Sequence, residues 1–186
     1  AASPAFGAGS RRTSAQALSV AARSGDLALG GGNADGTSVV LSAAGGTIST
    51  GAGGFVVTPG TLTLSGKAID LSGGAAQGAQ VNVAAETLRN IDGTLASLGD
   101  AAFNVSGAFD NSNGDIFAAN RLTLNAGSLV NAGGRIAHAG TDVLDIRISG
   151  HADNAHGNII GNGALSLSAG SLANDAGLIV TPKGGV

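Results

Sequence analysis

The stretch that decides the fold is an eight-residue motif, which reads Leu-Arg-Asn-Ile-Asp-Gly-Thr-Leu at residues 88–95. It returns as Phe-Asp-Asn-Ser-Asn-Gly-Asp-Ile at 109–116, Leu-Val-Asn-Ala-Gly-Gly-Arg-Ile at 129–136, Ala-Asp-Asn-Ala-His-Gly-Asn-Ile at 152–159 and Leu-Ala-Asn-Asp-Ala-Gly-Leu-Ile at 172–179. Successive motif asparagines are separated by 21, 20, 23 and 20 residues. A constant period of this length is typical of a solenoid, in which each repeat forms one coil that stacks on the last.

Short apolar patterns fall at fixed distances from this motif. Each unit begins with an alternating pair, such as Val81/Val83 or Leu122/Leu124, and a further apolar residue follows, such as Leu88 or Leu129. The last residue of the motif is also aliphatic. Because alternate residues of a strand point to opposite faces, this pattern predicts three short strands per coil with one face inward. We therefore expect an all-β chain folded as a parallel β-helix with coils of about 20 residues.

The regularity of the pattern divides the chain into three segments. Residues 1–17 are rich in Ala, Gly and Ser and are expected to form a linker or a frayed end. Residues 18–53 carry short apolar alternations between glycine clusters, which predicts irregular β coils or a cap. Residues 54–186 are expected to form the regular β-helix, although unit 137–159 is longer than the others and Leu71 replaces the asparagine of unit 61–80.

The recurring Asn and Gly residues predict a structural ladder at one corner of the coil. Both residue types tolerate positive φ, which sharp corners need, and an Asn side chain can bond to the turn backbone or to the Asn of the next coil. The expected ladder consists of Asn90, Asn111, Asn131, Asn154 and Asn174, with Gly93, Gly114, Gly134, Gly157 and Gly177.

Composition supports a narrow core and gives no charge signal for a partner. Gly accounts for 33 of 186 residues and aromatics for only 3%, so Leu, Ile, Val and Ala must fill the interior. The net charge is -3 with 9 basic residues, and there is no basic stripe of the kind that nucleic-acid binding requires. There is no Cys and no apolar run long enough to span a membrane as a helix.

An enzyme is the alternative function, because parallel β-helices also host polysaccharide lyases and hydrolases. Such hydrolysis needs a pair of carboxylates, and the densest polar cluster contains Asp142, Asp145 and Arg147 beside His151 and His156. The simpler interpretation is that Asp145 and Arg147 are outward residues of an alternating strand. The chain also has few aromatic faces on which sugars could stack. We therefore expect no enzyme and no catalytic residue.

Metal and cofactor sites are not expected either. His138, His151 and His156 lack the spacing of a ligand set, and no Cys supports them. Units that break the repeat are better candidates for contact with a partner, because insertions in solenoids map to loops that often bind. The candidate contact residues are Phe117, as an exposed apolar residue, and His151 and His156.

Units that read Leu-x-Leu … Leu-x-Asn-x-x-Gly-x-Ile resemble the repeats of filamentous haemagglutinins, the large exoproteins of bacterial two-partner secretion, and the stalks of contact-dependent inhibition toxins. The resemblance extends over about residues 61–182. It implies a right-handed parallel β-helix, exported through an outer-membrane secretion partner and displayed on the bacterial cell surface as a virulence-associated adhesin or stalk. It also implies reach and attachment to host or neighbouring cells through an unidentified receptor or glycan. Because the chain has no Met, we expect it to be a segment of a longer protein.

Overall fold

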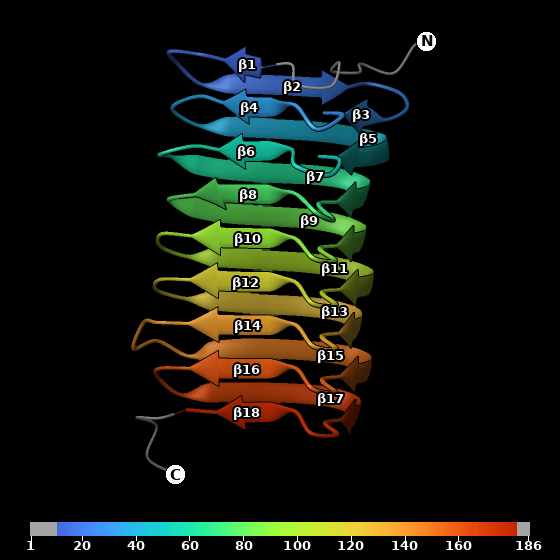
Figure 1. Ribbon diagram of the computed structural model, residues 1–186, viewed down its shortest axis with the longest axis vertical. Coiled ribbons are helices and arrows are strands. Elements are labelled where there is room, and N and C mark those ends of the chain that lie inside the picture. Colours follow the sequence, from blue (N-terminus) through green and yellow to red (C-terminus); the bar gives the residue numbers. More distant parts are fainter. Residues whose placement is uncertain (1–10, 182–186) are drawn as a thin grey trace.

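Each coil of the chain adds one long and one short strand to a stack of parallel strands (Figure 1). The computed structural model describes residues 11–181, which contain strands and turns and no helix. They form a parallel β-solenoid of about eight turns with roughly 21 residues per coil. The predicted all-β solenoid fold is therefore confirmed.

The two sets of strands form two parallel sheets that face each other across the core. The long strands are β2 (Leu18–Ala22), β5 (Val39–Ser49), β7 (Thr61–Asp70), β9 (Gln80–Arg89), β11 (Ala101–Asp110), β13 (Leu122–Val130), β15 (Leu144–Asp153) and β17 (Leu165–Ala173), and β3 (Leu27–Ala28) extends this sheet beside β5. The short strands are β1 (Arg11–Thr13), β4 (Asn33–Asp35), β6 (Phe55–Val57), β8 (Ala75–Gly78), β10 (Thr94–Ser97), β12 (Asp115–Ala118), β14 (Arg135–His138), β16 (Asn158–Gly161) and β18 (Leu178–Val180).

The predicted division into three short strands per coil is changed at one point. The first two segments are joined as a single long strand, which bends where its pairing register shifts, for example between Val105 and Ala108 of β11. Each full coil therefore has three corners. We call them the bend within the long strand, the asparagine corner between the long and short strands, and the return corner that leads to the next long strand.

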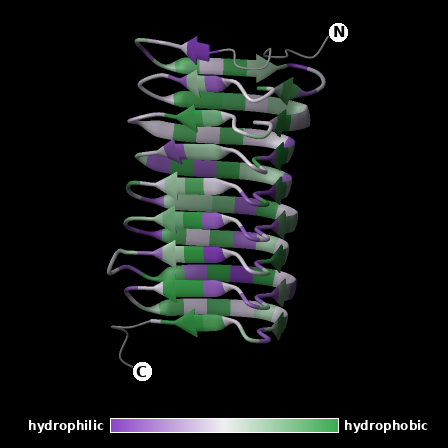
Figure 2. Cartoon of the chain, in the orientation of Figure 1, coloured by the Kyte–Doolittle hydropathy of each residue, from purple (hydrophilic) through white to green (hydrophobic). Residues whose placement is uncertain are grey.

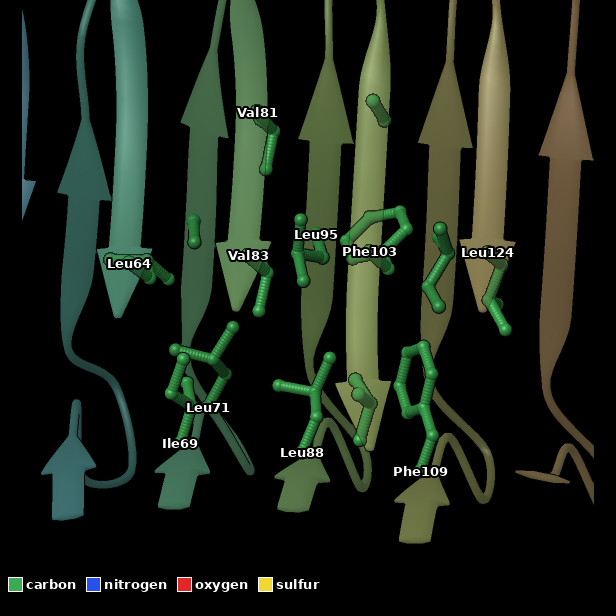
Figure 3. Close-up of a cluster of buried hydrophobic side chains, with 14 of the residues drawn as sticks. Leu64, Ile69, Leu71, Val81, Val83, Leu88, Leu95, Phe103, Phe109 and Leu124 are labelled. Atoms are coloured by element: carbon green, nitrogen blue, oxygen red, sulfur yellow. The ribbon is translucent and has the colours of Figure 1, made fainter. Parts of the chain in front are cut away.

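The core is a column of aliphatic side chains that the register aligns from coil to coil. In β11 the inward residues Phe103 and Phe109 are at most 1% exposed, and Phe103 lies in register between Val83 and Leu124. Figure 3 shows these side chains between the two sheets. The two phenylalanine rings lie with their centroids 6.0 Å apart, so a single coil accommodates both. Burying one such side chain contributes roughly 1.5–3 kcal/mol.

The stack of coils extends further towards the N-terminus than the sequence pattern indicates. β1 lies within the segment predicted to be a linker, yet Arg11–Thr13 pairs in parallel with Asn33–Asp35 of β4. β2 pairs in the same way with β5, so residues 18–53 form coils in register with the rest. Residues 1–10 and 182–186, at the two ends of the predicted segments, lie outside the described residues.

The three extra residues of unit 137–159 are divided between two corners. Leu122 pairs with Leu144 and Ile116 with Ile136, so two of them lengthen the return corner at residues 139–143. The third lies at the bend of β15, where the register shifts again before Ala152. The loop between β14 and β15 projects further from the rod than its neighbours (Figure 1).

Candidate functional site

The motif asparagines lie one above another at the asparagine corner. From Asn90 to Asn174, each Nδ2 donates to the Oδ1 of the next asparagine, over 2.8, 2.7, 2.7 and 2.6 Å. Each Nδ2 also donates to the carbonyl of the glycine three residues later, over 3.1–3.3 Å. The first four asparagines are at most 1% exposed. Because these side chains are buried and bonded to one another, they stabilise the stack and offer nothing to a ligand.

The ladder glycines are required for space rather than for backbone conformation. A Cβ at Gly114, Gly134, Gly157 or Gly177 would lie 2.0–2.2 Å from the asparagine carbonyl oxygen of the preceding coil, and at Gly93 2.7 Å from Leu71 O. None of these glycines has positive φ. The positive φ falls on the residue before each one, and the sequence-based explanation was wrong on this point. The residues with that backbone conformation are Asp92, Asn113, Gly133, His156 and Ala176.

A second column of glycines at the bend was not identified from the sequence. A Cβ at Gly107 would lie 2.7 Å from Glu86 O, and one at Gly127 2.8 Å from Gly107 O. Gly150 and Gly170 continue the column with similar distances. The signal was present in the sequence, because each of these four glycines precedes a ladder asparagine by four residues.

Asp142 and Asp145, which were considered for catalysis, have structural partners, as do two carboxylates at the asparagine corner. Asp110 Oδ1 accepts hydrogen bonds from the backbone N and the hydroxyl of Ser112, and Asp153 Oδ1 accepts one from Ala155 N, so both cap the asparagine corner. Asp142 pairs with Arg121 at 3.4 Å across neighbouring return corners. Asp145 pairs with Arg147 at 2.5 Å on the outer face of β15.

The three histidines lie at three different places on the coil. His138 is 2% exposed and points into the core from β14. His151 is exposed, and its Nδ1 lies 2.9 Å from Ser171 Oγ. His156 is exposed at the asparagine corner. Within residues 11–181, no three or more His, Cys, Asp or Glu side chains are arranged to hold a metal ion.

Phe117 is not among the exposed large apolar side chains, whereas two residues of the return corners are. Phe117 is half-buried on the outer face of β12, in register between Ala96 and Ala137. By contrast, Leu98 is 59% exposed and Val143 is 44% exposed. A shallow hollow near the same corners is lined by Gln80, Asn82, Asp100, Ala101, Ala102, Arg121 and Thr123. We call Leu98, Asp100, Arg121, Asp142 and Val143 the return-corner surface.

Polar side chains recur with the coil instead of gathering in one cleft. Figure 2 shows hydrophilic residues returning in the turns on the right of the rod, where the asparagine corners lie. The return-corner surface is different because it combines two exposed aliphatic side chains with an ion pair in which both partners are more than half exposed. Such a mixture suits contact with another surface better than it suits enclosure of a small molecule.

The chain matches no protein-family model, no curated protein and no solved structure. Residues 11–181 contain no helix with the length and hydropathy that crossing a membrane requires. By its fold, the chain belongs to the class of β-solenoid proteins.

Proposed function

We propose that the chain is a structural and adhesive segment of a large bacterial surface filament, which extends from the cell and attaches to host or neighbouring cells. The observation that carries the proposal is the run of buried asparagine hydrogen bonds over five consecutive coils. These bonds link every coil in this part of the rod to the next, which suits a protein that must remain an extended rod. Export through an outer-membrane partner and display on the bacterial cell surface are part of this proposal.

The attachment surface in this proposal is the return-corner surface. Its two exposed aliphatic side chains, Leu98 and Val143, project from the corners that precede β11 and β15. Loops on one face of a solenoid vary without disturbing the stack, so contact residues can change there at little cost to the fold. Arg121 and Asp142 lie between them in the chain and give the surface a polar component.

Attachment is measured by coating beads with the chain and counting the bacterial and epithelial cells that bind. Wild-type beads should bind more cells than albumin-coated beads, and the double variant Leu98→Ser, Val143→Ser should lose most of this excess. The matched control is Val40→Ser, because Val40 is 37% exposed but lies on the outer face of β5. Equal binding by wild-type and albumin-coated beads would overturn the proposal.

The same preparation tests the alternative of a polysaccharide-degrading enzyme. The proposed filament segment should release no reducing sugar from pectin, alginate or peptidoglycan. Release of reducing sugar that disappears in Asp142→Asn or Asp145→Asn would favour the enzyme. Both carboxylates belong to the irregular unit 137–159, which also contains the exposed His151 and His156.

A further inference from the structure

The return corner between β14 and β15 follows a buried histidine whose ring nitrogens make no hydrogen bond of good geometry. His138 is 2% exposed and lies in register between Ala118 of β12 and Gly161 of β16. The small neighbours leave room for its ring. In the part of the chain that the structure describes, neither ring nitrogen makes a hydrogen bond of good geometry, although the Asn120 backbone lies close enough to interact with the ring. A buried polar group without a partner is uncommon in a folded protein and calls for an explanation.

In two other coils the same inward position holds a hydroxyl side chain, and in three it holds Gly78, Ala118 or Gly161. Thr58 occupies it in β6's coil, and its hydroxyl donates to Gly36 O over 2.8 Å. Ser97 occupies it in β10, and its hydroxyl donates to Asp100 O over 2.7 Å. Both hydroxyls donate a hydrogen bond to a backbone carbonyl at a corner. Neither ring nitrogen of His138 makes a hydrogen bond of good geometry.

Few charged groups face His138. Its own return corner brings Asp142, and the return corner after β12 brings Arg121, which pairs with Asp142 at 3.4 Å. On the other side, β16 contributes Gly161 and the corner contributes Asn162, neither of which titrates. Burial lowers the pKa of His138 below its ordinary value, while the Asp142 carboxylate and the Asn120 backbone oppose this shift. The buried imidazole is therefore neutral at neutral pH.

We propose that residues 139–143 form a proton-controlled latch, which is closed over neutral His138 and opens when the imidazole takes up a proton. A charged imidazole loses its hydration inside the core and finds no acceptor of good geometry there. Outside the core it regains water and lies near the Asp142 carboxylate. Opening breaks the hydrogen bonds from Ala139 N to Ala118 O, 3.0 Å, and from Asn162 N to His138 O, 3.1 Å.

The direction of the pH dependence follows from proton linkage. The open corner has the higher histidine pKa, so it binds more protons than the closed corner. The latch therefore stays closed above the ordinary histidine pKa of about 6.5 and opens as the pH falls below it. The population of the open form rises by up to about tenfold per pH unit until the lowered pKa of the closed form is reached.

Hydrogen exchange of single amides tests the latch in the intact chain. Between pH 7.5 and pH 5, exchange corrected for its intrinsic rate should accelerate at Ala139 and Asn162. It should not change at Asn111, whose amide donates to Val130 O at the asparagine corner. Equal protection of Ala139 and Asn162 at the two pH values would overturn the proposal.

Variants separate His138 from the other histidines. His138→Ser, which copies Ser97, should remove the acceleration, and the matched controls His151→Asn and His156→Asn should keep it. Acceleration that persists in His138→Ser would overturn the proposal. If His138→Ser fails to fold, NMR titration of the wild-type imidazoles decides. The latch requires the pKa of His138 to lie below the ordinary histidine value of about 6.5, and a pKa at or above that value would also overturn it.

Discussion

At the scale of single residues, the asparagine ladder shows how the same side chain can make different contributions in different coils. Asn131 donates to Asn154 Oδ1 and accepts from Asn111, so its removal leaves partners on both sides without a bond. Asn90 is different, because its Oδ1 has no partner within the described residues and Leu71 lies in the adjacent coil. The same amide should therefore contribute unequally to stability along the ladder.

Replacement by leucine, the residue found at position 71, measures this difference. Asn131→Leu should lower the free energy of unfolding by about 2–4 kcal/mol, because two buried amides lose a partner. Asn90→Leu should cost about 1 kcal/mol less, since it breaks one ladder bond rather than two. Urea denaturation followed by circular dichroism measures both. Asn125→Ala, on the exposed Asn104–Asn125 pair, is the control and should cost under about 0.5 kcal/mol. Equal costs for the two leucine variants would contradict this view of the ladder.

Neighbouring positions of the asparagine corner should respond oppositely to the exchange of Gly and Ala. Gly134→Ala should destabilise by about 3 kcal/mol or more, because the new Cβ would lie 2.2 Å from Asn111 O, a backbone atom that cannot move away. Ala176→Gly should stabilise by about 1 kcal/mol, because Ala176 has φ 53°. Thermal unfolding at fixed pH compares them. A neutral Gly134→Ala would show that the corner is looser than its geometry indicates.

At the scale of strands and corners, the return corner tolerates changes in length that the strands do not. It joins β12 to β13 in three residues, 119–121, and β14 to β15 in five, 139–143. The register on both sides is unchanged, with Leu122 opposite Leu144. Loop length has a small effect on stability, whereas a one-residue slip in a strand turns every inward side chain outward.

A pair of deletions tests this contrast. Removing Thr141 and Asp142 shortens the corner to the length of its neighbour, and the variant should stay folded with its free energy of unfolding within about 1 kcal/mol of wild type. Removing only Asn125 from β13 is the control, and it should abolish cooperative unfolding because the core residues that follow leave the interior. Circular dichroism and urea titration give the result. A loss of folding in the two-residue deletion would mean that this corner holds the coil in place.

At the scale of the whole molecule, each coil contacts mainly its neighbours, so stability is close to a sum of coil terms and interfaces. Residues 111–130 constitute one period, and their removal would join Asp110 to Asn131 with the ladder and both sheets still in register. The shortened chain should fold, give a shorter rod by X-ray scattering, and show a urea m-value lower by about one part in eight. Removal of residues 111–120 alone should prevent folding, because half a coil breaks both sheets. A shortened rod that does not fold would show that the solenoid is cooperative over more than its nearest neighbours.

Much of this architecture follows from spacing alone. The period of the Asn-x-x-Gly motif, together with the alternating pairs such as Val81/Val83, is sufficient to predict stacked β coils. This is possible because a solenoid repeats one local problem, namely how to turn a corner and bury one face, and solves it with similar residues in every coil. The positions of the five motif asparagines relative to one another follow from the same period.

The tertiary structure alone decides matters that depend on the neighbouring coil. Gly134 is required because Asn111 O lies against it, and Phe117 is half-buried although its side chain lies on the outer face of β12. Alternation places His138 on the same face as Ile136, but only the neighbouring coils show that Ala118 and Gly161 leave space for its ring. The period and the alternation of the sequence predict where a residue lies within its own coil. Steric clashes, missing hydrogen-bond partners and the exposure of corners depend on how the coils pack against one another, which only the tertiary structure shows.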